Sequence, residues 1–165
     1  MNTFKDKTLL ITGGTGSFGS TVLRHFVNTD IAQIRIFSRD EKKQDDMRHE
    51  YQVKYPEASN KIKFYIGDAL ELLPGMDITF DLAFIDGDKR KYVEYYEQVL
   101  KMLSPGGYII ADNTLWDGHI IDPNYDKDKQ TIGLRAFNDQ LAQDERFEKV
   151  ILPLRDGLTM IRKTK

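Results

Sequence analysis

Three residues with metal-binding side chains follow two apolar runs that are neighbours along the chain. Asp86 ends the run "FDLAFID", and Asp112 and Asn113 end the run "GYIIADN". Because adjacent strands of a doubly wound sheet end at one crevice, two carboxylates and an amide oxygen can converge there. Such oxygen-only ligands suit a hard cation, Mg²⁺ or Ca²⁺. The same residue types are also common in turns and caps, so the spacing leaves both interpretations open.

A second candidate site lies near the N-terminus, in "TLLITGGTGSFGS". Gly13, Gly16 and Gly19 separate a strand-like run from a helical pattern. The first allows a tight turn, the second lets a diphosphate approach the backbone, and the third lets the helix pack closely on the strand. The other residues of this turn that we predict to bind a dinucleotide are Thr15, Ser17 and Phe18. The alternative is a glycine-rich connection without a ligand.

The next strand-like run ends at Ser38 and Arg39. A fold that binds NAD usually carries an acidic residue here for the ribose, whereas a nearby arginine accommodates the 2′-phosphate of NADP. The pair therefore favours NADP over NAD. The alternative for Arg39 is a solvated loop charge, and Asp40 is the nearest carboxylate.

Apolar runs of strand length alternate with helical patterns through most of the chain. The expected strands are residues 8–12, 33–38, 61–67, 81–86, 108–111, 149–154 and 158–162. Several runs are continuously apolar, as expected where helices cover both faces of a sheet. The alternation predicts an α/β, doubly wound, Rossmann-like three-layer sandwich with a mostly parallel sheet of about seven strands. Asp156-Gly157 is a hairpin signal, which predicts an antiparallel last strand.

Two helices have recognisable limits in the sequence. The helix around residues 92–103 should stop at the breaker "SPGG", residues 104–107. Residues 40–55 are mostly charged and predict a surface helix with a thin buried stripe of Met47, Tyr51 and Val53. The longest irregular segment, residues 114–130, is a candidate lid or site loop.

Composition limits the class of protein and its partners. The chain has 165 residues, no cysteine and a formal net charge of -2. The length fits a single domain over residues 1–165, and the charge gives no reason to expect nucleic acid or an anionic membrane as partner. No apolar stretch approaches the about 20 residues of a membrane helix, and no signal-peptide core is visible. We expect a soluble cytoplasmic domain whose partner is a small-molecule nucleotide cofactor, and a homodimer is compatible with this.

Residues 4–68 resemble the N-terminal part of an extended short-chain dehydrogenase/reductase, of the nucleotide-sugar dehydratase and epimerase type. The resemblance is carried by "FKDKTLLITGGTGSFGS", "IRIFSRDEKKQDDMR" and "KFYIGD". It implies a bound NADP(H) or NAD(H), with Asp68 and Ala69 beside the adenine ring. That family also needs a Tyr-x-x-x-Lys pair for proton transfer, whereas Tyr92 is followed at that spacing by Tyr96. Dehydratase or epimerase activity is therefore not expected.

Residues 67–163 resemble a different family, the cation-dependent S-adenosylmethionine O-methyltransferases of the catechol and caffeoyl-CoA type. The resemblance is carried by "GDALELLP", "FDLAFIDGDKRKYVEYYE", "MLSPGGYIIADNTLWDG" and "FNDQLAQDERFEKVILPLRDGLTMIRK". It implies that Asp86, Asp112 and Asn113 hold Mg²⁺ and that Lys89 deprotonates the hydroxyl that the metal acidifies. It also implies the methyltransferase strand order 3-2-1-4-5-7-6.

The two resemblances meet within residues 66–70, and each half stays close to its own family. We therefore interpret residues 1–67 and 68–165 as the dehydratase-like and methyltransferase-like halves of an engineered chimera. Three functions are open: a module that binds NADP(H) or NAD(H) with little or no catalysis, a metal-dependent O-methyltransferase that uses S-adenosylmethionine, and a scaffold without a cofactor. Ser38 and Arg39 stand where a methyltransferase has a ribose-binding acid, and they favour the first.

Overall fold

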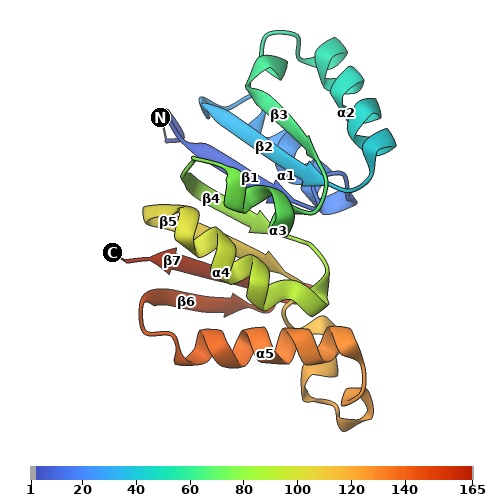
Figure 1. The fold of residues 1–165 in the computed structure, drawn as a ribbon, viewed down its shortest axis with the longest axis vertical. Coiled ribbons are helices and arrows are strands. Elements are labelled where there is room, and N and C mark those ends of the chain that lie inside the picture. The colour runs from blue at the N-terminus through green and yellow to red at the C-terminus, as the bar shows by residue number, and fades with distance from the viewer. Residues whose placement is uncertain (1–2, 165) are drawn as a thin grey trace.

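The computed structural model describes residues 3–164 and contains one sheet of seven strands, in the order β3-β2-β1-β4-β5-β7-β6 (Figure 1). The strands are β1 Thr8–Thr12, β2 Gln33–Ser38, β3 Ile62–Ile66, β4 Phe80–Ile85, β5 Leu103–Asp112, β6 Phe147–Leu152 and β7 Leu158–Lys163. β1 to β5 pair in parallel, and β7 runs antiparallel to both β5 and β6. The predicted fold class, strand order and antiparallel last strand are confirmed.

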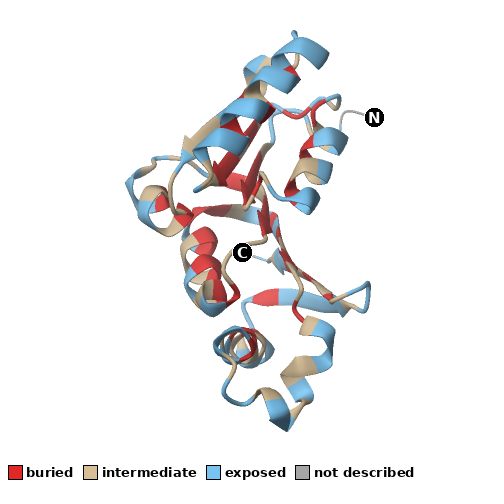
Figure 2. Ribbon diagram, turned by 90° about the vertical axis from the view of Figure 1, so that its right-hand side faces the viewer, coloured by how far each residue is buried: buried red, intermediate tan, exposed pale blue. Residues whose placement is uncertain are grey.

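Helices cover the sheet on both faces. They are α1 Ser17–Phe26, α2 Glu41–Lys54, α3 Ala69–Leu72, α4 Tyr92–Met102 and α5 Lys129–Gln143, with short 3-10 turns η1 Ser59–Lys61, η2 Leu73–Gly75, η3 Lys89–Lys91, η4 Trp116–Ile121 and η5 Pro123–Tyr125. Leu9 and Ile11 pack in the cluster that includes residues of α1 and α2, whereas Leu10 packs in the cluster of α3, α4 and α5. Successive strand residues point to opposite faces, so a strand between two helix layers must be apolar throughout. Figure 2 shows the buried residues along the middle layer.

β5 begins earlier than the sequence predicts. The helix before it ends at Met102, close to its expected limit, but the strand starts at Leu103 instead of Tyr108. The breaker residues therefore lie inside the strand, where Gly106 has a φ of +75° and the register with β4 shifts. Breaker residues stop a helix, but they do not prevent an irregular strand start.

α2 buries Met47 and Tyr51 as predicted, but its stripe includes Gln44 in place of the predicted Val53. Asp40 caps this helix by accepting a hydrogen bond from Lys43 N at 2.9 Å. Val53 is 82% exposed, whereas the polar Gln44 is fully buried. The Gln44 amide donates to the carbonyl oxygens of Ser38 and Tyr65, so it links the ends of β2 and β3.

The irregular segment after β5 is tied to α5 by one side chain. Arg135 donates to the carbonyl oxygens of Ile120 at 2.8 Å, His119 at 3.1 Å and Asp122 at 2.9 Å. Its guanidinium also pairs with Asp126 at 2.6 Å. These contacts hold η4 and η5 against the helix that follows them. Within residues 3–164, no helix has the length and apolar character needed to cross a bilayer.

An ion pair at the end of α5 should make stability depend on pH. Asp144 accepts hydrogen bonds from Arg146 at 2.5 Å and Tyr96 at 3.0 Å, and the arginine contact lowers the pKa of Asp144 to about 2. A carboxylate with a lowered pKa stabilises the fold above about pH 4, and this contribution is lost as the pH falls toward 2. Asp144→Asn should therefore lower the free energy of unfolding by about 1 kcal/mol at pH 7, a modest value because Arg146 is exposed. Urea titrations should show the full difference at pH 7 and a clearly smaller one at pH 2.5, where Asp144, with a pKa of about 2, is still partly ionised in the folded chain. An equal difference at both would contradict this account.

Candidate active site

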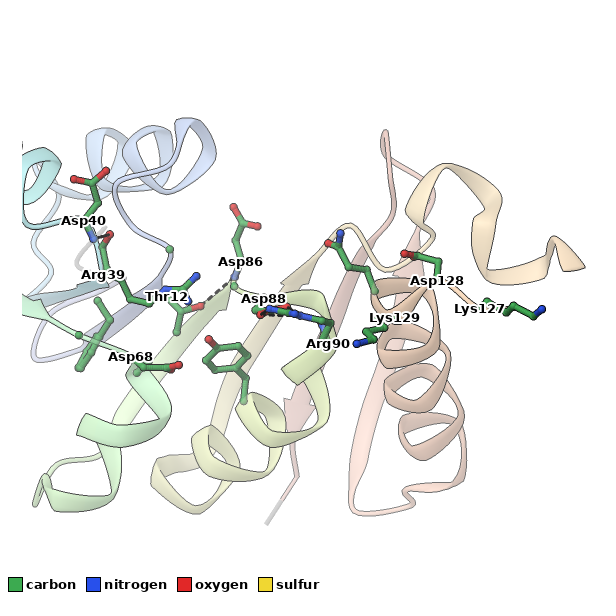
Figure 3. A pocket seen from close by; sticks show the side chains of 18 residues that line it. Thr12, Arg39, Asp40, Asp68, Asp86, Asp88, Arg90, Lys127, Asp128 and Lys129 are labelled. Atoms are coloured by element: carbon green, nitrogen blue, oxygen red, sulfur yellow. Dashed lines mark hydrogen bonds and ion pairs between the residues drawn. The ribbon is translucent and has the colours of Figure 1, made fainter. Parts of the chain in front are cut away.

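A cavity of about 730 Å³ opens at the carboxyl end of the sheet, and we call it the strand-end cavity (Figure 3). Residues that follow β1, β2, β3 and β4 line it, together with Tyr95 of α4 and the start of α5. Thr12 ties β1 to β4 beneath it, because its hydroxyl donates to Phe84 O at 3.3 Å and accepts from Asp86 N at 3.1 Å. Doubly wound folds bind their ligands at this edge of the sheet.

The glycine-rich turn meets the strand-end cavity mainly through Gly13. Gly13 has a φ of +63° and lines the cavity, whereas five other predicted residues of the turn are not among the lining residues: Thr15, Gly16, Ser17, Phe18 and Gly19. Phe18 stacks on Phe84 at 4.8 Å between ring centroids. A Cβ on Gly19 would lie 2.7 Å from Gly14 Cα, so this glycine allows α1 to pack on the turn.

The end of β2 presents both predicted residues, Ser38 and Arg39, to the cavity. The hydroxyl of Ser38 forms a hydrogen bond with Thr15 Oγ1 at 2.7 Å and accepts from Asp40 N at 3.2 Å. In Figure 3 the Arg39 side chain extends toward Thr12, whereas the Asp40 carboxylate points away. The end of β2 therefore brings a guanidinium, as the sequence indicates, to the wall of the cavity.

Asp68 and Ala69 line the same cavity at the start of α3. Asp68 accepts from Leu70 N at 3.0 Å and pairs with Lys91 at 3.0 Å. Burial raises the pKa of Asp68, but these two hydrogen bonds outweigh it and hold the pKa below its usual value. Asp68 is thus a fixed carboxylate in the cavity wall.

Lys89 is a buried cation next to the strand-end cavity, with 6% of its surface exposed. Its Nζ donates to Asp86 Oδ1 at 3.0 Å, to Tyr92 Oη at 2.5 Å and to Asp112 O at 3.5 Å. Burial lowers the pKa of Lys89, and the charges of Asp86, Asp112 and Asp156 oppose this shift. A lysine in this setting can lose its proton more readily than an exposed one.

The predicted cation ligands lie together at the ends of β4 and β5 but do not form a closed set. Asp86 lines the cavity and pairs with Lys89, while Asp112 Oδ1 accepts from Asn113 N at 2.9 Å. Burial raises the pKa of Asp112, and the charges of Asp86 and Asp156 add to the shift. In the described part of the chain, no three His, Cys, Asp or Glu side chains are close enough together to hold a metal ion. The available donors are oxygen atoms, the type that Mg²⁺ prefers.

Several cavity residues were missed by sequence reasoning. Asp88 and Arg90 form an ion pair in the cavity wall, and the hydrogen bonds from Arg90 lower the pKa of Asp88 to about 2. Residues 127–130, at the start of α5, also line the cavity. "DGDK" offered a signal for Asp88, because it continues the strand-end motif. Residues 127–130 belong to the irregular segment that the sequence marks as a candidate lid or site loop, residues 114–130, and the path of this segment brings them to the cavity.

Comparison with known proteins identifies the family. The model of the O-methyltransferase family matches residues 31–164. The chain belongs to the O-methyltransferase family. It is 42% identical over 89 residues to probable caffeoyl-CoA O-methyltransferase 1 of Dictyostelium discoideum, a match over 54% of this chain and 39% of that protein. The chain therefore spans well under half the length of this relative.

Two further similarities complete the comparison. A solved O-methyltransferase from Bacillus cereus, in complex with SAH, superposes with a TM-score of 0.79 at 27% identity and covers 95% of this chain and 74% of that one. UDP-glucose 4-epimerase of Rickettsia canadensis is 50% identical over 90 residues, which cover 48% of this chain and 25% of the epimerase. The latter agrees with the resemblance of the N-terminal part to extended short-chain dehydrogenase/reductases.

These findings correct the functional interpretation of the sequence. The interpretation as a dinucleotide-binding module with little or no catalysis is not supported. NADP, which the pair of Ser38 and Arg39 favoured, is not supported as the main cofactor. The interpretation as an engineered chimera is not supported either, because the family match runs across the expected boundary at residues 67 and 68. A short strand–turn–helix pattern is shared by many nucleotide-binding folds, so it cannot by itself identify the nucleotide.

Proposed function

We propose that this chain transfers the methyl group of S-adenosylmethionine to a hydroxyl oxygen of a small catechol-like acceptor. The observation that carries the proposal is the buried Lys89, held between Asp86 and the end of β5 beside the strand-end cavity. Membership of the O-methyltransferase family supports the reaction class.

The strand-end cavity is the proposed site of the methyl donor. Gly13 would let the ligand approach the β1 backbone, and Asp68 and Ala69 would border its adenine ring. The relative from Bacillus cereus was solved in complex with SAH, the product that remains when the methyl group has left. This supports S-adenosylmethionine as the cofactor.

In the proposed reaction, Lys89 accepts the proton of the acceptor hydroxyl as the oxygen takes the methyl group from the sulfonium. The new bond is C–O, the bond that breaks is C–S, and the products are a methyl ether, SAH and a proton held by Lys89. Burial of Lys89 lowers its pKa and so favours the neutral amine that this step needs. Tyr92 Oη and Asp86 Oδ1 hold the Nζ atom in place.

A divalent cation is part of the proposal, with Asp86, Asp112 and Asn113 as the residues that would hold it. The donor set fits because it consists of oxygen atoms. In addition, burial and the charges of Asp86 and Asp156 raise the pKa of Asp112, and a bound cation would offset both effects. When bound, the cation would acidify the acceptor hydroxyl.

The test is a direct assay of methyl transfer. The chain is incubated with S-adenosylmethionine and catechol, with Mg²⁺ or with EDTA, and SAH and methylated catechol are measured by mass spectrometry. We expect both products to form in equal amounts with Mg²⁺ and to fall to background with EDTA. Binding of S-adenosylmethionine in calorimetry without any turnover on catechol or caffeoyl-CoA would contradict the proposed reaction.

Arg39 is expected to weaken binding of the methyl donor. S-Adenosylmethionine carries a net positive charge, and the guanidinium extends over the cavity that it would enter. Arg39→Ala should therefore lower the Kd for S-adenosylmethionine about 3- to 10-fold, equivalent to roughly 1 kcal/mol for a screened charge pair. Calorimetry can measure this, with Lys63→Ala on an exposed position of β3 as control. Weaker binding by Arg39→Ala would show instead that the guanidinium contacts the ligand.

Two other expectations stay predictions. A homodimer can be tested by sedimentation velocity, and a cytoplasmic location can be tested by cell fractionation.

A further inference from the structure

The turn between β6 and β7 is docked onto the segment that follows β5. The carbonyl oxygen of Asp156 accepts from Leu115 N at 2.7 Å and from Trp116 N at 3.2 Å, and Gly157 O accepts from Thr114 N at 3.1 Å. A Cβ on Gly157 would lie 2.4 Å from Leu115 Cγ, so the two segments are in close contact. The turn therefore reaches the edge of the sheet where Asp112 and Asn113 lie.

The docked segments hold residues in an unfavourable backbone conformation. Asn113 has a φ of 60°, Trp116 of 47° and Arg155 of 51°. Non-glycine residues adopt such angles rarely, asparagine more readily than the others, and they persist where the surroundings fix them, often next to functional sites. The contacts between the two segments supply this constraint.

We propose that Asp156 is a positioning residue for Asn113. Asp156 Oδ2 accepts a hydrogen bond from Asn113 Nδ2 at 3.3 Å. A carboxamide carries its nitrogen and oxygen on opposite sides of one carbon, so a contact that fixes Nδ2 also fixes the place of Oδ1 and leaves that oxygen as the free ligand atom. The inference rests on the proposed function, because it gives Asn113 Oδ1 to the cation site.

Asp156 could act on the cation site in two ways, which two substitutions can distinguish. As a positioning residue it needs only an acceptor oxygen, which an asparagine side chain also provides. As a source of negative charge near Asp112 it would need the carboxylate itself. Asp156→Asn keeps the acceptor and removes the charge, whereas Asp156→Ala removes both, so this pair of variants separates the roles. Both substitutions keep the backbone atoms through which the turn bonds to Thr114, Leu115 and Trp116.

The test uses two measurements on the full chain. The side-chain amide resonance of Asn113, assigned by its loss in Asn113→Ala, reports the contact without any cation. Calorimetry with Mg²⁺ reports the site, with S-adenosylmethionine affinity as a check on the cavity. Asp139→Ala, an exposed acid on α5, is the control for loss of one negative charge. Thermal unfolding verifies that each variant is folded.

We expect Asp156→Ala to shift the Asn113 amide resonance and to weaken Mg²⁺ binding about 10- to 100-fold, as outer residues of a metal site do. Asp156→Asn should restore the affinity to within about threefold of the unsubstituted chain. In the Asn113→Ala background, Asp156→Ala should have no further effect on the Mg²⁺ affinity. An unmoved amide resonance, an equal loss in Asp156→Asn, or additive losses would each overturn the inference. Failure of the unsubstituted chain to bind Mg²⁺ while it still methylates catechol would overturn the inference and the proposed cation site, and would leave only the methyl transfer by Lys89 standing.

Discussion

Replacing Lys89 with methionine is expected to lower kcat for methyl transfer about 10²- to 10⁴-fold, the usual contribution of a positioned base. The affinity for S-adenosylmethionine should change less than threefold, because Lys89 does not line the strand-end cavity. Its Nζ contacts Asp86, Tyr92 and Asp112 instead. Methionine has a similar length and fills the buried site, so the fold should persist. Single-turnover assays with saturating methyl donor measure the effect.

Lys101→Met provides the matched control, since it removes an exposed lysine from α4, away from the cavity. Its kcat should equal that of the unsubstituted chain. If Lys89→Met instead retained full activity with an intact fold, Lys89 would not be the base. A variant that loses both turnover and the cooperative unfolding transition would show a structural role for the buried ammonium.

Gly13→Ala is expected to give the largest loss of stability among single substitutions at the site. A Cβ at this position would lie 2.0 Å from Asp86 O, and the φ of +63° already disfavours any side chain. The backbone of β1 or β4 must then shift, which should cost about 3 kcal/mol or more and lower Tm by about 6–12 °C. Because Thr12 and Asp86, the neighbours of this contact, both line the strand-end cavity, the affinity for S-adenosylmethionine should also fall.

Gly75→Ala is the control for the loss of a glycine. No atom lies within 4 Å of a Cβ built there, so the free energy of unfolding should change by less than about 0.5 kcal/mol. Scanning calorimetry and urea unfolding measure both variants. A Gly13→Ala chain with an unchanged Tm would mean that the turn can move away from β4 without loss.

The element types and their order could be read from the sequence because they depend on local patterns. Continuous apolar runs such as residues 8–12 belong to strands with helices on both faces, and Asp156-Gly157 marks the final hairpin. The position of chemical groups at strand ends was also predictable, since every parallel strand delivers its last residue to one edge. The early start of β5 and the burial of Gln44 were not, because both depend on partners distant in sequence.

The sequence by itself determined the fold class and placed Asp86, Asp112 and Asn113 at neighbouring strand ends. Only the tertiary structure decided which atoms meet there. The Lys89 side chain lies between Asp86 and Tyr92, and Gly133 lets α5 approach the Lys89 backbone, where a Cβ would lie 2.4 Å from Lys89 O. Distances of this kind depend on how helices pack on the sheet. Periodicity reports which face of an element is apolar, but it does not report what lies opposite that face.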